Sequence, residues 1–161
     1  MNDTGREQAR TVGKELAGQG WDLVLGSPLG RAQQTAEIIA TELGAATGPA
    51  VEQIVERGFG ALEGQCRSEL DDDLVQQLLE AAEPRQHVLQ RAIQGLNGIV
   101  QTFPGRRILC VSHGATMRIV RDTLAGFRLE RGVENGEVLP VDVQQLAQLH
   151  RQLLNGSIPV V

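Results

Sequence analysis

The chain has 161 residues, of which 41% are apolar and 22% charged, a composition typical of a globular protein with one hydrophobic core. The formal net charge is −5 and only 2% of the residues are aromatic. The chain therefore lacks the basic surface that neutralises a nucleic-acid backbone and the rings that stack on bases. We expect a single domain over residues 1–161 that does not bind nucleic acid.

Cysteine usage and hydropathy limit the chemistry further. Cys66 and Cys110 form no CxxC pair, and no histidine lies near them at metal-ligand spacing, so neither a metal site nor a disulfide framework is indicated. The opening residues are polar, and no apolar run approaches ~18 residues. We therefore expect a cytoplasmic protein without a membrane segment.

Residues 1–25 predict a helix followed by a strand. Thr4 and Glu7 match a capping box, which predicts a helix over residues 5–17. Glycines at 18 and 20 end this helix. The largely apolar run at residues 21–25 then predicts a short buried strand of the kind found in parallel sheets.

A second helix is predicted to begin at Ser27. This serine is expected to be the N-cap, with Pro28 in the first helical position, and apolar residues follow at helical spacing as far as Leu43. Glycine and alanine at 44–50 end the helix. Residues 51–64 contain turn glycines without a helical period, which predicts irregular structure.

The remaining chain predicts further helices around one clear strand. Leucine and isoleucine spacing predicts helices near residues 70–79 and 89–99, although two glycines disfavour the second. Ile108–Val111 is the clearest buried strand, and a helix, an alternating segment at 138–143 and a last helix follow it. This alternation indicates a three-layer α/β/α fold with a mostly parallel sheet.

Two strand-to-helix turns form the expected ligand site, because helix N-termini at the carboxyl ends of parallel strands present free N–H groups. Arg31, one turn into its helix, can reach back to an anion there, but the alternative is a surface arginine that is paired with Glu37 or left solvated. His113 precedes Gly114, which gives a ligand room to approach the backbone. The alternative is a buried turn histidine bonded to a carbonyl.

Three segments carry a family signature in a fixed order: SPLGRAQQTA at 27–36, ERGFGALEG at 56–64 and SHG at 112–114. They resemble the motifs of the histidine phosphatase superfamily, the phosphoglycerate mutase-like proteins. TGREQA at residues 4–9 is also similar to the helix start of that family. The resemblance therefore extends over most of the chain.

The resemblance implies a phosphorylated small-molecule substrate, no cofactor and no metal. It assigns roles to five residues: phosphate binding to Arg31, completion of the phosphate pocket to His113 and Gly114, support at the pocket rim to Ser27, and proton donation to Glu56. A histidine would attack phosphorus and form a phosphohistidine. From the residues alone, a carboxylate in a glycine-rich loop is more often solvated, and Glu63 is a rival to Glu56.

The attacking histidine is expected to lie outside this sequence. In the family it belongs to an Arg-His-Gly motif at the end of an interior strand, upstream of the helix that opens this chain. Neither His87 nor His150 ends a strand at a glycine turn. We therefore expect a phosphoglycerate mutase-like domain without its first strand, which would leave neighbouring backbone groups unpaired.

Three functions stay open at this point. The first is a phosphate-monoester hydrolase or phosphomutase. The second is a non-catalytic pseudoenzyme that holds phosphorylated ligands through Arg31 and His113, since loss of a nucleophile removes many powers of ten in rate. The third is an interaction protein whose open sheet accepts a strand from another protein or from its own copy, which makes a homo-oligomer possible.

Overall fold

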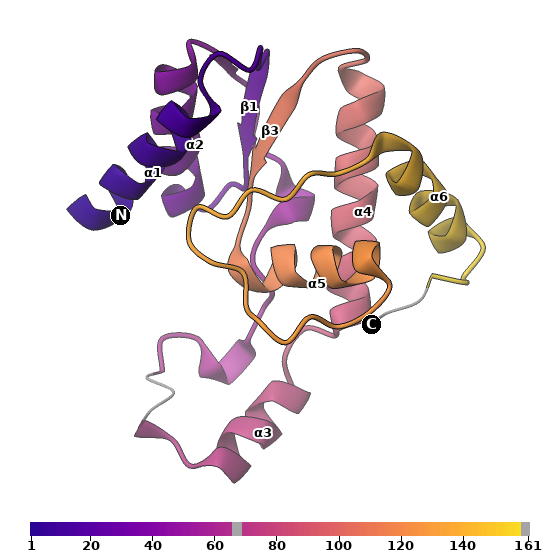
Figure 1. The fold of residues 1–161 in the computed structure, drawn as a ribbon. Coiled ribbons are helices and arrows are strands. Elements are labelled where there is room, and N and C mark those ends of the chain that lie inside the picture. Colours follow the sequence, from indigo (N-terminus) through magenta and orange to yellow (C-terminus); the bar gives the residue numbers. More distant parts are fainter. Residues whose placement is uncertain (66–68, 159–161) are drawn as a thin grey trace.

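The computed structural model describes residues 1–65 and 69–158 (Figure 1). The helices are α1 (Asp3–Leu16), α2 (Gly30–Leu43), α3 (Asp72–Glu80), α4 (Arg85–Thr102), α5 (Gly114–Ala125) and α6 (Val143–Leu154). The strands are β1 (Leu23–Gly26), β2 (Ala46–Thr47) and β3 (Ile108–Val111), and two 3-10 helices are η1 (Glu52–Ile54) and η2 (Gly60–Leu62). Cys66 lies outside the described residues, so the expectation for it is not tested.

The sheet is parallel, with strand order β2-β1-β3. Gly26 pairs with Val111 at the carboxyl ends of β1 and β3, and the ladder continues one residue further, where the amide of Ser27 donates to the carbonyl of Val111 at 2.9 Å. Within the described residues β3 is an edge strand, since it pairs with β1 alone. The parallel sheet between helices confirms the predicted α/β fold.

The two faces of β1 belong to different parts of the core. Val24 packs with α1 and α2 on one face, whereas Leu25 packs with η1 and the Ile99 side of α4 on the other. A third cluster joins α4, α5 and α6 (Figure 1). Helices thus cover both faces of the sheet at β1, whose residues 24–26 are buried, whereas the four residues of β3, predicted as a buried strand, are only partly buried.

Two predicted helix caps are wrong. Asn2, not Thr4, caps α1, because its side chain accepts a hydrogen bond from the amide of Gly5 at 2.9 Å. Ser27 does not cap α2, which begins at Gly30 after the extended residue Leu29. Ser27 instead extends the β1 ladder, so its backbone is still in strand pairing where the cap was expected.

The middle of the chain contains more regular structure than predicted. The two-residue strand β2 and the short helices η1 and η2 lie within segments expected to be irregular, and residues 138–142 form no strand. Helix α4 runs uninterrupted through Gly95 and Gly98. Gly95 is needed there, because a Cβ atom at this position would lie 2.6 Å from Cβ of Gln53.

Candidate functional site

The ends of β1 and β3 are joined by a side-chain contact. Ser27 follows β1, His113 follows β3, and Nε2 of His113 lies 2.8 Å from Oγ of Ser27, across 86 residues of sequence. Ser27 is fully buried and His113 is 6% exposed. Ser27 therefore contacts the imidazole from within the protein.

Arg31 lies in the first turn of α2, on the exposed side of this contact. Its guanidinium forms no hydrogen bond or ion pair with any described residue, so the alternative pairing with Glu37 is not formed there. A Cβ atom at Gly114 would meet nothing within 4 Å, so open space adjoins the start of α5 beside His113. The turn after β1 thus carries an exposed arginine without a partner among the described residues, and the turn after β3 has open space beside Gly114.

The electrostatic environment favours the neutral form of His113. Burial is the main cause that lowers the pKa of its imidazole, and the charge of Arg31 lowers it further. Glu56 acts in the opposite direction, and Arg91 makes a smaller contribution that also lowers the pKa. Both Arg31 and Glu56 are therefore close enough to His113 to affect its titration.

Glu56 faces the first turn of α5. Its Oε1 accepts hydrogen bonds from the amides of Arg57 at 2.9 Å and Thr116 at 3.3 Å, and Thr116 lies three residues after His113. Glu63 is exposed, and its Oε1 accepts from the amide of Phe59 at 3.0 Å, where it supports the turn around η2. Of the two rival carboxylates, only Glu56 contacts the helix that begins at His113.

The helices that follow β1 and β3 begin without side-chain caps from their N-cap residues, Leu29 and His113. Helix α4 also begins without a side-chain cap, at Pro84, whereas α1, α3 and α6 are capped by asparagine or aspartate side chains. Free N–H groups and the helix dipole make such an N-terminus favourable for an anion. The two turns with Arg31 and His113 therefore form a suitable place for a phosphate group.

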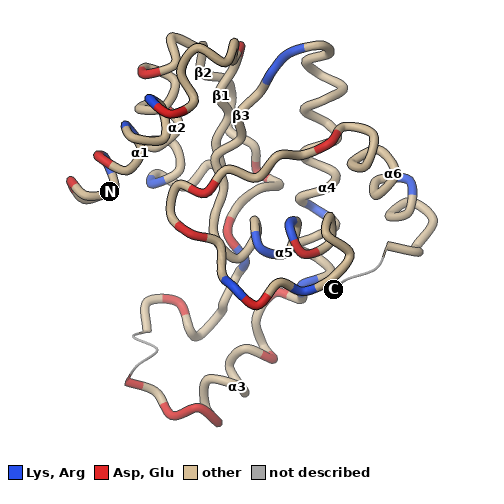
Figure 2. Tube along the Cα trace, in the orientation of Figure 1, with Lys and Arg blue, Asp and Glu red and all other residues tan. Residues whose placement is uncertain are grey.

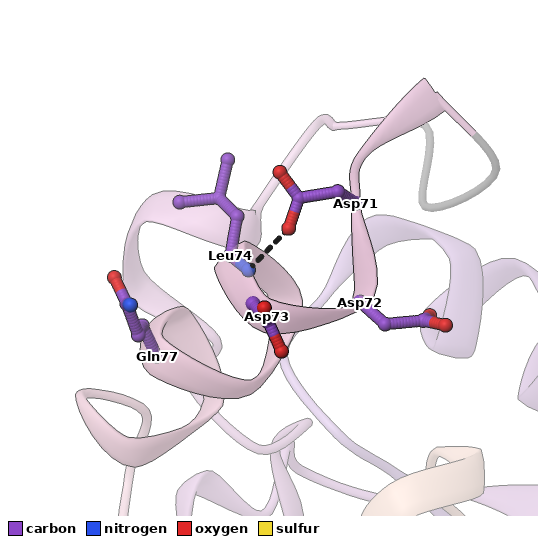
Figure 3. Close-up of a pocket in the computed structure, with 5 residues that line it drawn as sticks. All are labelled: Asp71, Asp72, Asp73, Leu74 and Gln77. Carbon is purple, nitrogen blue, oxygen red and sulfur yellow. Dashed lines mark hydrogen bonds between the residues drawn. The ribbon is translucent and has the colours of Figure 1, made fainter.

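The charge distribution separates this region from an acidic one. Arginines lie along α5 and at the start of α4, whereas carboxylates dominate the start of α3 (Figure 2). A cavity of about 540 Å³ at that acidic end is lined by Asp71, Asp72, Asp73, Leu74 and Gln77. Figure 3 shows the carboxylate of Asp71 turned back to the amide of Leu74, which it caps at 2.8 Å. Three carboxylates disfavour a phosphate in this cavity.

A second cavity, of about 360 Å³, lies between α1 and residues 135–136, and the residues that line it include none of the candidates above. Within residues 1–65 and 69–158 no group of three or more His, Cys, Asp or Glu side chains could hold a metal ion. None of the helices in those ranges has both the length and the apolarity needed to cross a bilayer.

Sequence reasoning missed Arg91 and Glu83, which form an ion pair at 2.8 Å next to the Glu56 segment. The available signal was an arginine beside the apolar stripe of α4, where Val88, Leu89 and Ala92 are fully buried. A charged residue at the border of a buried helix face needs a partner. The sequence pattern gave no indication of which residue that partner would be.

Comparison with known proteins supports the motif resemblance. Residues 1–148 match the histidine phosphatase superfamily (branch 1). The chain is 32% identical over 128 residues to the uncharacterized phosphatase PhoE of Bacillus subtilis, covering 78% of this chain and 65% of that protein. It is 28% identical over 159 residues to the probable phosphoglycerate mutase GpmB of Erwinia tasmaniensis, covering 90% of this chain and 74% of that one.

The fold comparison agrees. The solved structure of YhfR from Bacillus stearothermophilus superposes with a TM-score of 0.70 at 24% identity, over 81% of this chain and 69% of that one. The chain thus spans about two thirds of the length of PhoE and YhfR. Motifs, family match and fold together show that this chain belongs to branch 1 of the histidine phosphatase superfamily.

Proposed function

We propose that residues 1–161 form one phosphoglycerate mutase-like domain that binds the phosphate group of a phosphorylated small molecule and takes part in its hydrolysis or transfer. The observation that carries this proposal is the 2.8 Å contact between His113 and Ser27. It fixes the imidazole at the meeting point of two helix N-termini, beside the unpaired Arg31. A guanidinium donates two parallel hydrogen bonds to phosphate oxygens, so Arg31 is the main anion ligand in this proposal.

The proposed chemistry proceeds through a phosphohistidine. A histidine nitrogen attacks phosphorus, the P–N bond forms as the P–O ester bond breaks, and Glu56 gives its proton to the leaving oxygen. Water or a second hydroxyl then attacks the phosphohistidine, the P–N bond breaks, and Glu56 regains a proton. His113 and the amide at Gly114 stabilise the charge on the transferred group. No metal is required for these steps.

The attacking histidine in this proposal is none of the three in the sequence. His113 is bonded to Ser27, His87 lies on an exposed part of α4, and His150 belongs to α6. We therefore assign phosphate binding and proton donation to this chain and the nucleophile to a segment outside it. The same observation favours a second candidate function, a non-catalytic domain that holds phosphorylated ligands.

Binding of inorganic phosphate and orthovanadate, measured by isothermal titration calorimetry, tests the anion site. Each charge-assisted hydrogen bond is worth ~1.5–3 kcal/mol, so Arg31→Ala, which loses at least one of them, should weaken binding at least ~10-fold. Arg10→Ala removes an arginine from an exposed pair on α1 and serves as the matched control. Equal affinity in both variants, or no binding by the unmodified chain, contradicts the proposal.

Turnover of p-nitrophenyl phosphate tests whether the attacking histidine lies outside this chain. We expect negligible turnover by this chain. Turnover that disappears in His113→Ala would exclude the non-catalytic domain. The same result would also overturn the assignment of the nucleophile to a segment outside the chain.

A further inference from the structure

The segment that carries Glu56 accepts more hydrogen bonds from Arg91 than from any other side chain, while Ser112 and Thr116 each donate one to its carbonyls. Beyond η1 this segment is not part of a helix or strand, and three of its carbonyl oxygens accept hydrogen bonds from Arg91 on α4. Nη1 of Arg91 donates to the carbonyls of Gln53 and Val55, each at 2.8 Å, and Nη2 donates to that of Glu56 at 3.1 Å. Arg91 therefore contacts the backbone at three places immediately before and at Glu56, and the carbonyl of Glu56 itself accepts from Arg91.

Glu83 fixes that guanidinium in turn. Its two carboxylate oxygens accept from Nε and Nη2 of Arg91 at 2.8 and 2.9 Å, a paired geometry that holds the planar group in one orientation. Hydrogen bonding to Arg91 also keeps the pKa of the Glu83 carboxyl below its usual value. Both side chains are about four-fifths buried.

The same carboxylate reaches the other end of the segment. Oε2 of Glu83 accepts from the amide of Gly58 at 3.0 Å, and the amide of Glu83 donates to the carbonyl of Gly58 at 2.7 Å. Nε of Arg57 donates to the carbonyl of Glu83 at 2.7 Å. Arg91 and Glu83 thus hold the backbone on both sides of Glu56.

Helix α4 approaches this segment closely only because residue 95 is glycine. Gly95 lies one helical turn after Arg91, and a Cβ atom there would lie 2.6 Å from Cβ of Gln53. Gly98 lies on the same helix, and a Cβ atom there would meet nothing within 4 Å. Alanine at these two positions therefore gives a matched pair of variants, with only the first disturbing the contact.

Helix α5 contacts the segment from the opposite side. Oγ1 of Thr116 donates to the carbonyl of Val55 at 2.7 Å, so this carbonyl accepts from both Arg91 and Thr116. The amide of Thr116 donates to the Glu56 carboxylate itself. The position of this carboxylate beside α5 is thus fixed by the backbone that Arg91 holds.

From these contacts we infer that Arg91, oriented by Glu83, is a positioning residue that sets the backbone of residues 53–56 and so directs the Glu56 carboxylate to the first turn of α5. Arg91 acts through Glu56, with its guanidinium fully engaged by protein atoms. The inference deepens the proposed function, because the proton donor of that function is the group being positioned.

Amide hydrogen exchange and the titration of His113, both followed by NMR, test the inference in the intact chain. Arg91→Lys keeps a positive charge but loses the planar geometry, so we expect exchange at the amides of Arg57, Gly58 and Thr116 to rise at least ~10-fold, a change of about 1.4 kcal/mol in local opening. Exchange at the β1 amide of Leu25 should stay as in the unmodified chain. Gly95→Ala should have the same effect as Arg91→Lys, and Gly98→Ala none.

The titration separates positioning from general support of the fold. Glu56 raises the pKa of His113, against Arg31 and Arg91, which lower it. Glu56→Gln should lower the pKa of His113 directly, and Arg91→Lys should lower it by displacing Glu56. The pKa shift in the double variant should therefore be no larger than the shift in the single Glu56→Gln variant. Glu83→Gln should give a smaller shift in the same direction as Arg91→Lys.

A loss of thermal stability in Arg91→Lys, with unchanged exchange at Thr116 and unchanged His113 titration, overturns the positioning role. So does an additive shift in the double variant. Neither readout requires phosphate to bind, so a failure of the proposed function, seen as absent phosphate binding by the unmodified chain, is distinguishable from a failure of this inference.

Discussion

Replacement of Asp122 by alanine should be among the more damaging single substitutions in this chain. Asp122 is fully buried on α5, and its Oδ1 accepts from Nε and Nη2 of Arg121 at 3.2 and 3.0 Å and from the amide of Leu129 at 3.4 Å. Nitrogen atoms of Arg85 and Arg118 lie 3.7 and 3.8 Å from Oδ2. One carboxylate thus balances a cluster of arginines, and alanine would leave the cluster without its anion.

The expected loss of stability follows from the hydrogen-bond acceptors that Arg121 keeps after the carboxylate is removed. The Arg121 side chain is 8% exposed and would keep only the carbonyls of Gly132 and Arg131 as acceptors. Breaking a buried pair from one side costs ~3–5 kcal/mol. With an m-value of ~1–3 kcal/mol/M in urea, the unfolding midpoint should fall by about 1 M or more. Asp122→Asn, which keeps an acceptor oxygen, should cost less.

Urea unfolding followed by far-ultraviolet circular dichroism measures this effect. The control is Glu7→Ala, which removes the carboxylate from an exposed 2.9 Å pair with Arg10 and should change stability by no more than about 0.5 kcal/mol. If Asp122→Ala lowers the free energy of unfolding by less than 1 kcal/mol, the reasoning about the buried carboxylate is wrong.

Three further predictions concern titration, reactivity and packing. The pKa of His113 is lowered in the folded chain, so the unfolded chain takes up a proton first as pH falls through about 6.5, and the stability of the chain should decrease below that pH. The urea midpoint should change less between pH 7 and pH 5 in His113→Gln than in the unmodified chain. Burial raises the pKa of Cys110 to about 12, so in a Cys66→Ser variant the native thiol should react with Ellman's reagent at pH 8 far more slowly than in urea, and fast native labelling contradicts this. Gly13→Ala should destabilise the chain by ~1–3 kcal/mol, although alanine has the better helix propensity, because the alanine Cβ would lie 2.6 Å from Cβ of Glu42. A calorimetric melting temperature equal to that of the unmodified chain would refute this prediction.

Elements defined by local sequence were predictable. Ile108–Val111 is a continuous apolar run followed by a glycine-containing turn, and it forms β3 with the boundaries expected. Helix α5 follows directly at Gly114. In both cases the neighbouring residues alone supply the signal, since a short apolar run bounded by turns predicts a strand, although the residues of β3 are only partly buried.

Elements that depend on distant partners were not predictable. Ser27 precedes a proline in a pattern typical of an N-cap, but its hydroxyl contacts His113, 86 residues away. Strand β2 has two residues and exists only through its pairing with Leu23 and Val24. Local propensity carries no information on either contact, and tertiary context overrides it.

The motif resemblance named the residues of the candidate site but not the contacts that hold them in place. The motif resemblance pointed to Ser27, Arg31, Glu56 and His113 through residue types at fixed positions. It gave no indication of Arg91. The hydrogen bonds from this guanidinium to three carbonyls of another segment do not produce a repeating pattern in the sequence. Supporting contacts of this kind become visible only when backbone hydrogen bonds are followed one by one.

The hydrogen bond between Ser27 and His113 also predicts how a bound ligand changes the unfolding rate of the chain. The two residues follow β1 and β3, so they lie together only where these strands are paired. A phosphate held there would bind the native state but not the unfolded state, and would stabilise the native state by ~2.7 kcal/mol at a concentration of one hundred times Kd. We expect such a ligand to slow unfolding rather than speed refolding, because a contact across 86 residues of sequence is costly to close and is expected to form late in folding. The proteolytic lifetime of the chain should therefore lengthen as phosphate is added.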